Sequence, residues 1–177
     1  MKKSILFVLS FILFSTSLAQ SPVSKGVYSV SGSIAYSSSD EEKGNESSLF
    51  LFSPSAGYFF FDNIYTGLSL DYVNYTHNKN STARFGIGPS IRYYFDANET
   101  LKPFIGLSYS YLKQDSYLIF NEYALNVGAN LFMTNYFAVE GRIDYKLTSY
   151  NPSTVYSIGD SVTKTLRILL GVNYFIH

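Results

Sequence analysis

The chain has 177 residues, and its 13 lysines and arginines balance 13 aspartates and glutamates, which gives a formal net charge of zero. A neutral chain argues against nucleic acid as a partner, and the lack of cysteine excludes disulfides, thiolate metal sites and a cysteine nucleophile. Charged residues make up only 15% of the chain, against about 25% in an average soluble domain, whereas aromatic residues reach 18%. We therefore expect one domain with a surface poor in charge.

The first 19 residues predict a helical signal peptide. Lys2 and Lys3 form a basic start, an apolar run follows over Ile5–Phe14, and Ser17 and Ala19 supply small residues at a cleavage position. The apolar run is shorter than the about 20 residues that a helix needs to span a bilayer. We therefore expect residues 1–19 to be removed on export and residues 20–177 to form a single domain.

Eight alternating runs in the rest of the chain predict eight strands. In chain order they are residues 26–37, the two arms of 52–75, and then 83–95, 102–113, 118–132, 136–148 and 164–176. Tight turns near Asp62, Asp96 and Thr134 alternate with longer polar connections, among them residues 38–47 and 149–163. Since no stretch after the signal peptide keeps a 3.6-residue period, the fold class is all-β.

Residues 52–75 give the clearest pattern, because two alternating runs flank a short Asp62-Asn63 link. Successive side chains of a strand point to opposite faces, so each run predicts a strand with one apolar face and one small or polar face. The short link makes the pair an antiparallel hairpin. Parts of this hairpin return at residues 88–96 and 105–109, and the repetition predicts an up-and-down meander.

Alternation alone allows the apolar face to point inward, as in a soluble lipocalin-like carrier, or outward, as in a membrane barrel. The opposite face consists mostly of Ser, Gly, Asn and Thr, whereas a solvated exterior would be rich in Lys and Glu. Tilted runs of about ten residues also match the roughly 25 Å apolar band of an outer-membrane barrel. We therefore predict an eight-stranded antiparallel up-and-down transmembrane β-barrel with its apolar face toward lipid.

The polar face carries charges that nearly balance, which an internal ion-pair network requires because a buried unpaired charge is costly. The residues expected in this network are Asp71, Arg84, Arg92, Glu122, Glu140, Arg142, Asp144, Lys146 and Arg167. We expect Asp71 to lie beside Arg84 or Arg92. Phe59 and Tyr94 have inward parity near turns and are expected to fill the periplasmic end.

The signal peptide, the repeated Gly-Tyr-Phe…Asp-Asn…Gly-Leu-Ser hairpins and the last strand together resemble the small OmpA/OmpX-like outer-membrane barrels over residues 26–177. The resemblance implies a place in the cell outer membrane, insertion by the barrel-assembly machinery, and contact with outer-membrane lipid and lipopolysaccharide. Family members end in an alternating strand with a terminal aromatic residue. Here Tyr174 and Ile176 keep the alternation, but Phe175 is off-register and His177 follows.

The sequence indicates no catalytic residues, no cofactor site and no metal site, so we expect a non-enzymatic protein, present as a monomer. Its role is expected to be structural or adhesive, through the external connections. The expected contact residues there are Asp40, Glu41, Glu42, Tyr150 and Tyr156. Two alternatives stay open: a minor channel for small solutes, although side chains fill the interior of an eight-stranded barrel, and a soluble lipocalin-like carrier of apolar ligands.

Overall fold

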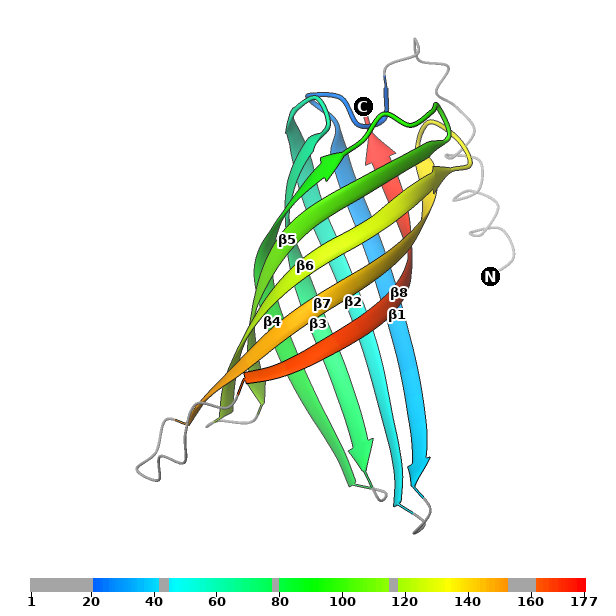
Figure 1. The fold of residues 1–177 in the computed structure, drawn as a ribbon. Helices are drawn as coiled ribbons and strands as arrows, with labels where there is room; N and C mark the ends of the chain where they lie inside the picture. The colour runs from blue at the N-terminus through cyan, green and yellow to red at the C-terminus, as the bar shows by residue number, and fades with distance from the viewer. Residues whose placement is uncertain (1–20, 42–44, 78–79, 115–117, 153–161) are drawn as a thin grey trace, which may run out of the picture.

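The computed structural model describes residues 21–41, 45–77, 80–114, 118–152 and 162–177, so the predicted signal peptide lies outside the described residues. Eight antiparallel strands, in chain order, form a closed barrel (Figure 1). They are β1 (Tyr28–Glu41), β2 (Asn45–Phe61), β3 (Ile64–His77), β4 (Asn80–Tyr94), β5 (Leu101–Gln114), β6 (Leu118–Phe132), β7 (Phe137–Pro152) and β8 (Val162–Ile176). The predicted all-β meander is confirmed. Within the described ranges, no helix is long and apolar enough to cross a membrane.

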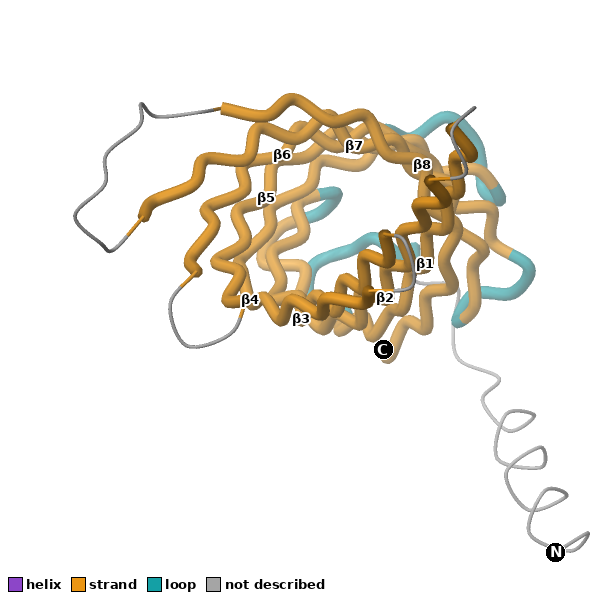
Figure 2. The backbone as a smooth tube through the Cα atoms, turned by 90° about the horizontal axis from the view of Figure 1, so that it is seen from below, coloured by secondary structure: helices purple, strands orange, loops and turns teal. Residues whose placement is uncertain are grey.

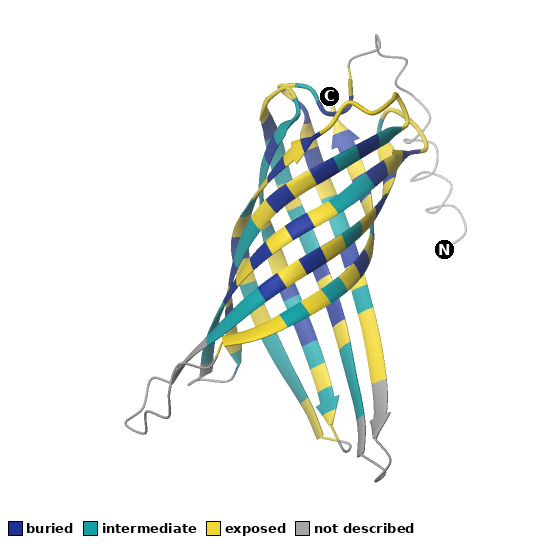
Figure 3. Ribbon diagram, viewed as in Figure 1, coloured by how far each residue is buried: buried dark blue, intermediate teal, exposed yellow. Residues whose placement is uncertain are grey.

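Side chains alternate between the lumen and the outer surface, which Figure 3 shows as alternating buried and exposed bands along the strands. On β8, for example, Ile168 and Leu170 are exposed, whereas Leu169 between them is buried. Large exposed apolar side chains occur on all eight strands. A continuous apolar exterior of this kind is stable against lipid and unstable in water, so the predicted outward apolar face is confirmed.

The outer hairpins are longer than the sequence predicts. β1 continues to Glu41 and β2 begins at Asn45, so most of the expected connection 38–47 is paired strand. β7 likewise continues to Pro152, and β8 begins at Val162. The expected boundaries were wrong because polar residues outside the membrane can still extend a ladder, whose hydrogen bonds satisfy the backbone.

The turns near Asp62, Asp96 and Thr134 lie at the end of the barrel that also holds the last residue of the chain (Figure 1). We assign this end to the periplasm because the strands at the opposite end continue beyond the band of large exposed apolar side chains. The link between β2 and β3 is tight, and Asn63 adopts a φ of 66°, a left-handed conformation that Asn tolerates well. Residues 21–27 cross the same end. The Val23 carbonyl accepts a 2.8 Å hydrogen bond from the Asn63 amide, and the Val27 carbonyl accepts one of 2.9 Å from the Phe59 amide.

A cluster of buried side chains, here called the periplasmic plug, fills this end of the lumen. Its members are Val23, Val27, Phe59, Tyr65, Tyr94, Phe104, Phe132, Ala138 and Phe175. The expected positions of Phe59 and Tyr94 are confirmed. Phe175, whose parity departs from the family pattern, points inward and packs against Phe132 with ring centroids 4.9 Å apart. Phe175 therefore belongs to the plug and does not contribute to the lipid-facing surface.

Candidate functional site in the barrel lumen

Charged side chains from β4 and β7 meet next to the periplasmic plug, on its side toward the outer end of the barrel. Glu140 is central: its carboxylate oxygens lie 2.8 Å from Arg92 Nη1 and 3.1 Å from Arg142 Nη1. The same carboxylate accepts a 2.9 Å hydrogen bond from Asn173 on β8. On its other side, Arg142 Nε lies 2.9 Å from Asp144 Oδ1. Arg142 therefore bridges two buried carboxylates, and Arg92 pairs with one of them.

A second group of charges lies farther toward the outer end. Lys146 Nζ lies 2.9 Å from one oxygen of Glu122, and Arg167 Nη2 lies 3.8 Å from the other. Thr148 also donates a 3.3 Å hydrogen bond to Glu122. The two groups together contain seven of the nine residues expected in an inward network, namely Arg92, Glu122, Glu140, Arg142, Asp144, Lys146 and Arg167.

The two remaining residues are placed differently. Asp71 accepts 2.6 Å hydrogen bonds from the hydroxyls of Ser53 on β2 and Ser110 on β5. It does not pair with Arg84 or Arg92 as expected. Arg84 lies with its Cζ 4.1 Å from the ring centroid of Phe120, and its Nε donates to Gln114. The expectation failed because parity fixes the face of a side chain but not its height in a tilted barrel.

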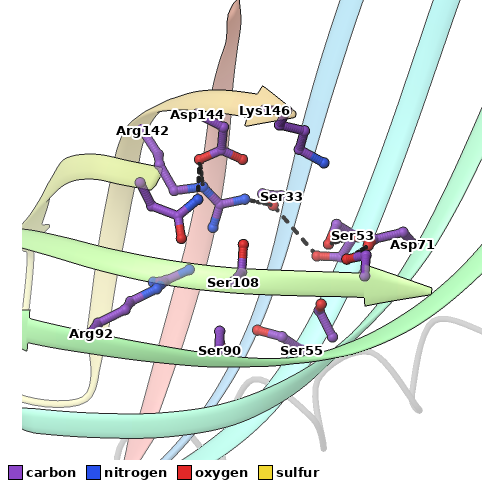
Figure 4. A pocket seen from close by; sticks show the side chains of 13 residues that line it. Ser33, Ser53, Ser55, Asp71, Ser90, Arg92, Ser108, Arg142, Asp144 and Lys146 are labelled. Carbon is purple, nitrogen blue, oxygen red and sulfur yellow. Dashed lines mark hydrogen bonds and ion pairs between the residues drawn. The ribbon is translucent and has the colours of Figure 1, made fainter. Parts of the chain in front are cut away.

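The lumen is asymmetric, as Figure 4 shows. Serines from β1 to β5 line one side of a small polar cavity, and charged residues of β7 line the other; the labelled serines are Ser33, Ser53, Ser55, Ser90 and Ser108. Arg142 joins the two sides through a 3.4 Å hydrogen bond to the Ser33 hydroxyl. The open space measures about 30 Å³, which holds about one or two waters. The middle of the barrel is therefore filled by side chains.

This arrangement neutralises charge inside the barrel, and it offers little for acid–base chemistry. Four inward carboxylates already have a hydrogen-bond or ion-pair partner, namely those of Asp71, Glu122, Glu140 and Asp144. Among the described residues, no group of three His, Asp or Glu side chains is placed to hold a metal ion. The geometry is that of a structural network.

Three of the five expected external contact residues lie on strands of the outer hairpins. Asp40 and Glu41 end β1, where Asp40 is paired with Glu46, and Tyr150 lies on β7, paired with Phe120. Glu42 and Tyr156 lie outside the described residues. The backbone of the first three is thus part of strands that continue beyond the apolar band.

Sequence reasoning missed a second apolar cluster, which lies inside the outer half of the lumen. This outer apolar cluster consists of Leu51, Val73, Leu112 and Leu169, with Ala35, Leu49 and Phe120 packed against it. Its members have the inward parity that the sequence associates with small and polar residues. Isolated apolar residues on each strand gave no periodic signal, and only barrel closure brings them together.

A family model described as "Outer membrane protein beta-barrel domain" matches residues 6–175. The chain belongs to this family. The protein is accordingly a barrel of the cell outer membrane, which rules out the soluble lipocalin-like alternative. No curated protein sequence matches the chain.

Solved structures of three other outer-membrane barrels share this fold. Neisserial surface protein A (NspA) is 20% identical with a TM-score of 0.59, over 85% of this chain and 97% of that chain. OprG of Pseudomonas aeruginosa is 15% identical with a TM-score of 0.54, over 87% and 97%. The N-terminal barrel domain of Pseudomonas aeruginosa OprF is 14% identical with a TM-score of 0.52, over 86% and 98%. Identities this low establish the architecture alone.

Proposed function

We propose that this barrel is a non-enzymatic, non-conducting outer-membrane protein that acts at the cell surface through its outer hairpins. The closed lumen is the observation that carries the proposal. The periplasmic plug covers one end, and the ion-pair network leaves about 30 Å³ open above it. A continuous water path for solutes needs far more room than the one or two waters that such a space holds.

Planar-bilayer recording tests the closed lumen. The wild-type barrel is expected to show no steady conductance, because the plug aromatics leave no aqueous path. A double variant, Phe59→Ala with Tyr94→Ala, removes two rings whose centroids lie 5.5 Å apart and is expected to produce small, flickering currents. Phe60→Ala, which changes an exposed ring next in sequence, serves as the matched control and should stay silent. Stable conductance of the wild type would favour the minor-channel alternative.

The outer hairpins supply the surface at which the protein would meet a partner. On β1 the last large lipid-facing side chain is Tyr36, and the strand continues for five residues to Glu41. The rim formed by these extensions is rich in Ser, Thr and Asn, which suits hydrogen bonding to a surface ligand better than apolar adhesion. A structural or adhesive role needs this rim to face outward.

Epitope insertion tests that orientation. A tag placed between Glu41 and Asn45 is expected to be stained by antibody on intact cells. The same tag placed between Asn98 and Glu99, in the turn at the opposite end, should be stained only after the outer membrane is permeabilised. The reverse pattern would invert the topology and remove the basis for a surface role.

We also propose that the protein is a monomer, that outer-membrane lipid and lipopolysaccharide surround it, and that the barrel-assembly machinery inserts it. Family membership supports these expectations. Chemical cross-linking in intact outer membranes should yield the monomer as the main species, and a dominant dimer band would contradict this part of the proposal.

A further inference from the structure

The seam between the first and last strands is closed over only part of its length. β1 and β8 pair from Tyr28 with Ile176 up to Ile34 with Leu170. Beyond that point, β1 stays paired with β2 up to Glu41, and β8 stays paired with β7 from Val162. Figures 1 and 2 show the two hairpins diverging toward the outer end. The barrel wall therefore has an opening in its outer half, where two strand edges lack each other as partners.

A notch of about 300 Å³ occupies this opening and passes through the wall. Its lining includes the lipid-facing side chains Tyr36, Leu166 and Ile168 together with the lumen-facing side chains Ala35, Leu49 and Arg167. Because both parities line one space, the notch connects the lipid-facing surface with the interior of the barrel.

The inner wall of the notch is apolar. Ala35 and Leu49 line the notch and also pack against the outer apolar cluster, which contains the buried Leu169 on the same strand as Arg167. An aqueous vestibule gains nothing from such a lining, whereas an apolar occupant would be stabilised by it. The ion-pair network and the periplasmic plug fill the lumen between this space and the periplasm. The space is therefore closed at its inner end and does not lead across the membrane.

Arg167 makes the notch suited to a negatively charged group. Its side chain is only 12% exposed, and its Nε and Nη1 atoms are buried without a hydrogen-bond partner among the described residues. Its nearest carboxylate oxygen, Glu122 Oε1, is 3.8 Å from Nη2 and also accepts a hydrogen bond from Thr148, while Lys146 lies at the other oxygen of Glu122. Buried guanidinium donors are normally satisfied, and an oxyanion is the acceptor that suits their geometry best.

We propose that the β1–β8 notch binds one acyl chain of a phosphate-bearing lipid from the surrounding outer leaflet. The chain enters between Tyr36 and Leu166 and lies against the outer apolar cluster, while the phosphate accepts hydrogen bonds from Arg167. The membrane is the source because the opening faces lipid and because a free phosphate would leave the apolar inner wall without a partner. Basic pockets bordered by apolar wall are a known form of headgroup recognition.

Photolabelling in vesicles tests the proposal. The barrel, purified from outer membranes, is reconstituted in phosphatidylcholine containing a trace of phosphatidic acid with a diazirine on one acyl chain. After irradiation, adducts are expected on Leu49 in the notch and on Leu51 and Leu169 of the outer apolar cluster behind it. Adducts confined to outward residues such as Leu166 and Ile168 would overturn the proposal, and they would leave the surface role untouched.

Charge variants test the headgroup. Arg167→Gln is expected to lower labelling of the inner residues by phosphatidic acid about tenfold, because charge-assisted hydrogen bonds are lost. Labelling by a phosphatidylcholine probe should change less, and Arg167→Lys should retain most of the signal. Lys164→Gln, on the exposed side of the same strand, is the matched control and should behave as wild type. Equal loss in both Gln variants, or no loss in either, would overturn the assignment of Arg167; gel mobility of unboiled samples confirms folding of each variant.

Discussion

At the scale of single residues, Glu140 has the most demanding environment in the lumen. It is 4% exposed and holds Arg92 and Arg142 at ion-pair distance, so Glu140→Gln leaves two buried cations short of a counter-charge. We expect a loss of about 3–5 kcal/mol in the free energy of unfolding, measured by urea titration in lipid vesicles. Glu99→Gln, an exposed turn residue, should change the same free energy by less than about 0.5 kcal/mol. Similar values for both variants would mean that the network contributes little.

Gly88 shows how backbone proximity constrains residue choice. Pairing of β4 with β5 is interrupted between Ile87–Tyr111 and Ser90–Ser108, at the point where Pro89 cannot donate to the ladder. A Cβ at position 88 would overlap the Tyr109 carbonyl group. Gly88→Ala is therefore expected to cost about 1–3 kcal/mol of unfolding free energy. Gly141→Ala, where a Cβ meets open space, is the control, and equal effects would show that β-propensity rather than crowding decides.

At the scale of the strand, the position of each residue relative to the membrane sets the cost of a charge. Leu107 faces lipid near the middle of β5 and is 60% exposed. Leu107→Arg should destabilise the barrel in vesicles by about 2–4 kcal/mol. Tyr111→Arg, on the same face but nearer the outer end, should cost about 0–1 kcal/mol. No difference between the two variants would place the apolar band elsewhere on β5.

The outer hairpins show where strand prediction from the sequence fails. Residues 38–41 and 45–47 are polar, which favours a loop, yet they pair in register because β1 and β2 already run together below them. Continuing an existing ladder adds hydrogen bonds without a new closure cost. The boundaries of these strands thus depend on neighbours, and local composition is a poor guide to them.

At the scale of the whole molecule, the lumen has three levels that differ in chemistry. An aromatic plug closes the periplasmic end, an ion-pair network with a serine wall fills the middle, and an apolar cluster lines the outer half. The plug and the ion-pair network block the passage of solutes along the lumen, while the outer apolar cluster borders the notch in the β1–β8 seam. The molecule is therefore closed toward the periplasm and open sideways toward the outer leaflet.

The candidate site was predictable only in part. Charge balance on one parity identified nine charged residues that face the lumen, because a buried charge needs a partner wherever it lies. It missed the buried Lys102, which pairs with Asp96. The identity of the partners was not predictable, since the contact of Arg92 with Glu140 joins residues 48 positions apart through the tilt of a closed sheet. The same limit explains Asp71, for which hydroxyls of Ser53 and Ser110 replace the expected cation.

By itself, the sequence determined the number of strands, the face that each residue occupies and the membrane location, because alternation and the balance of polar residues are local properties. Only the tertiary structure decided which charges meet, that isolated leucines gather into an outer apolar cluster, and that the β1–β8 seam opens beyond Ile34 and Leu170. These features depend on the height and stagger of strands around a closed barrel, and no single strand carries that information.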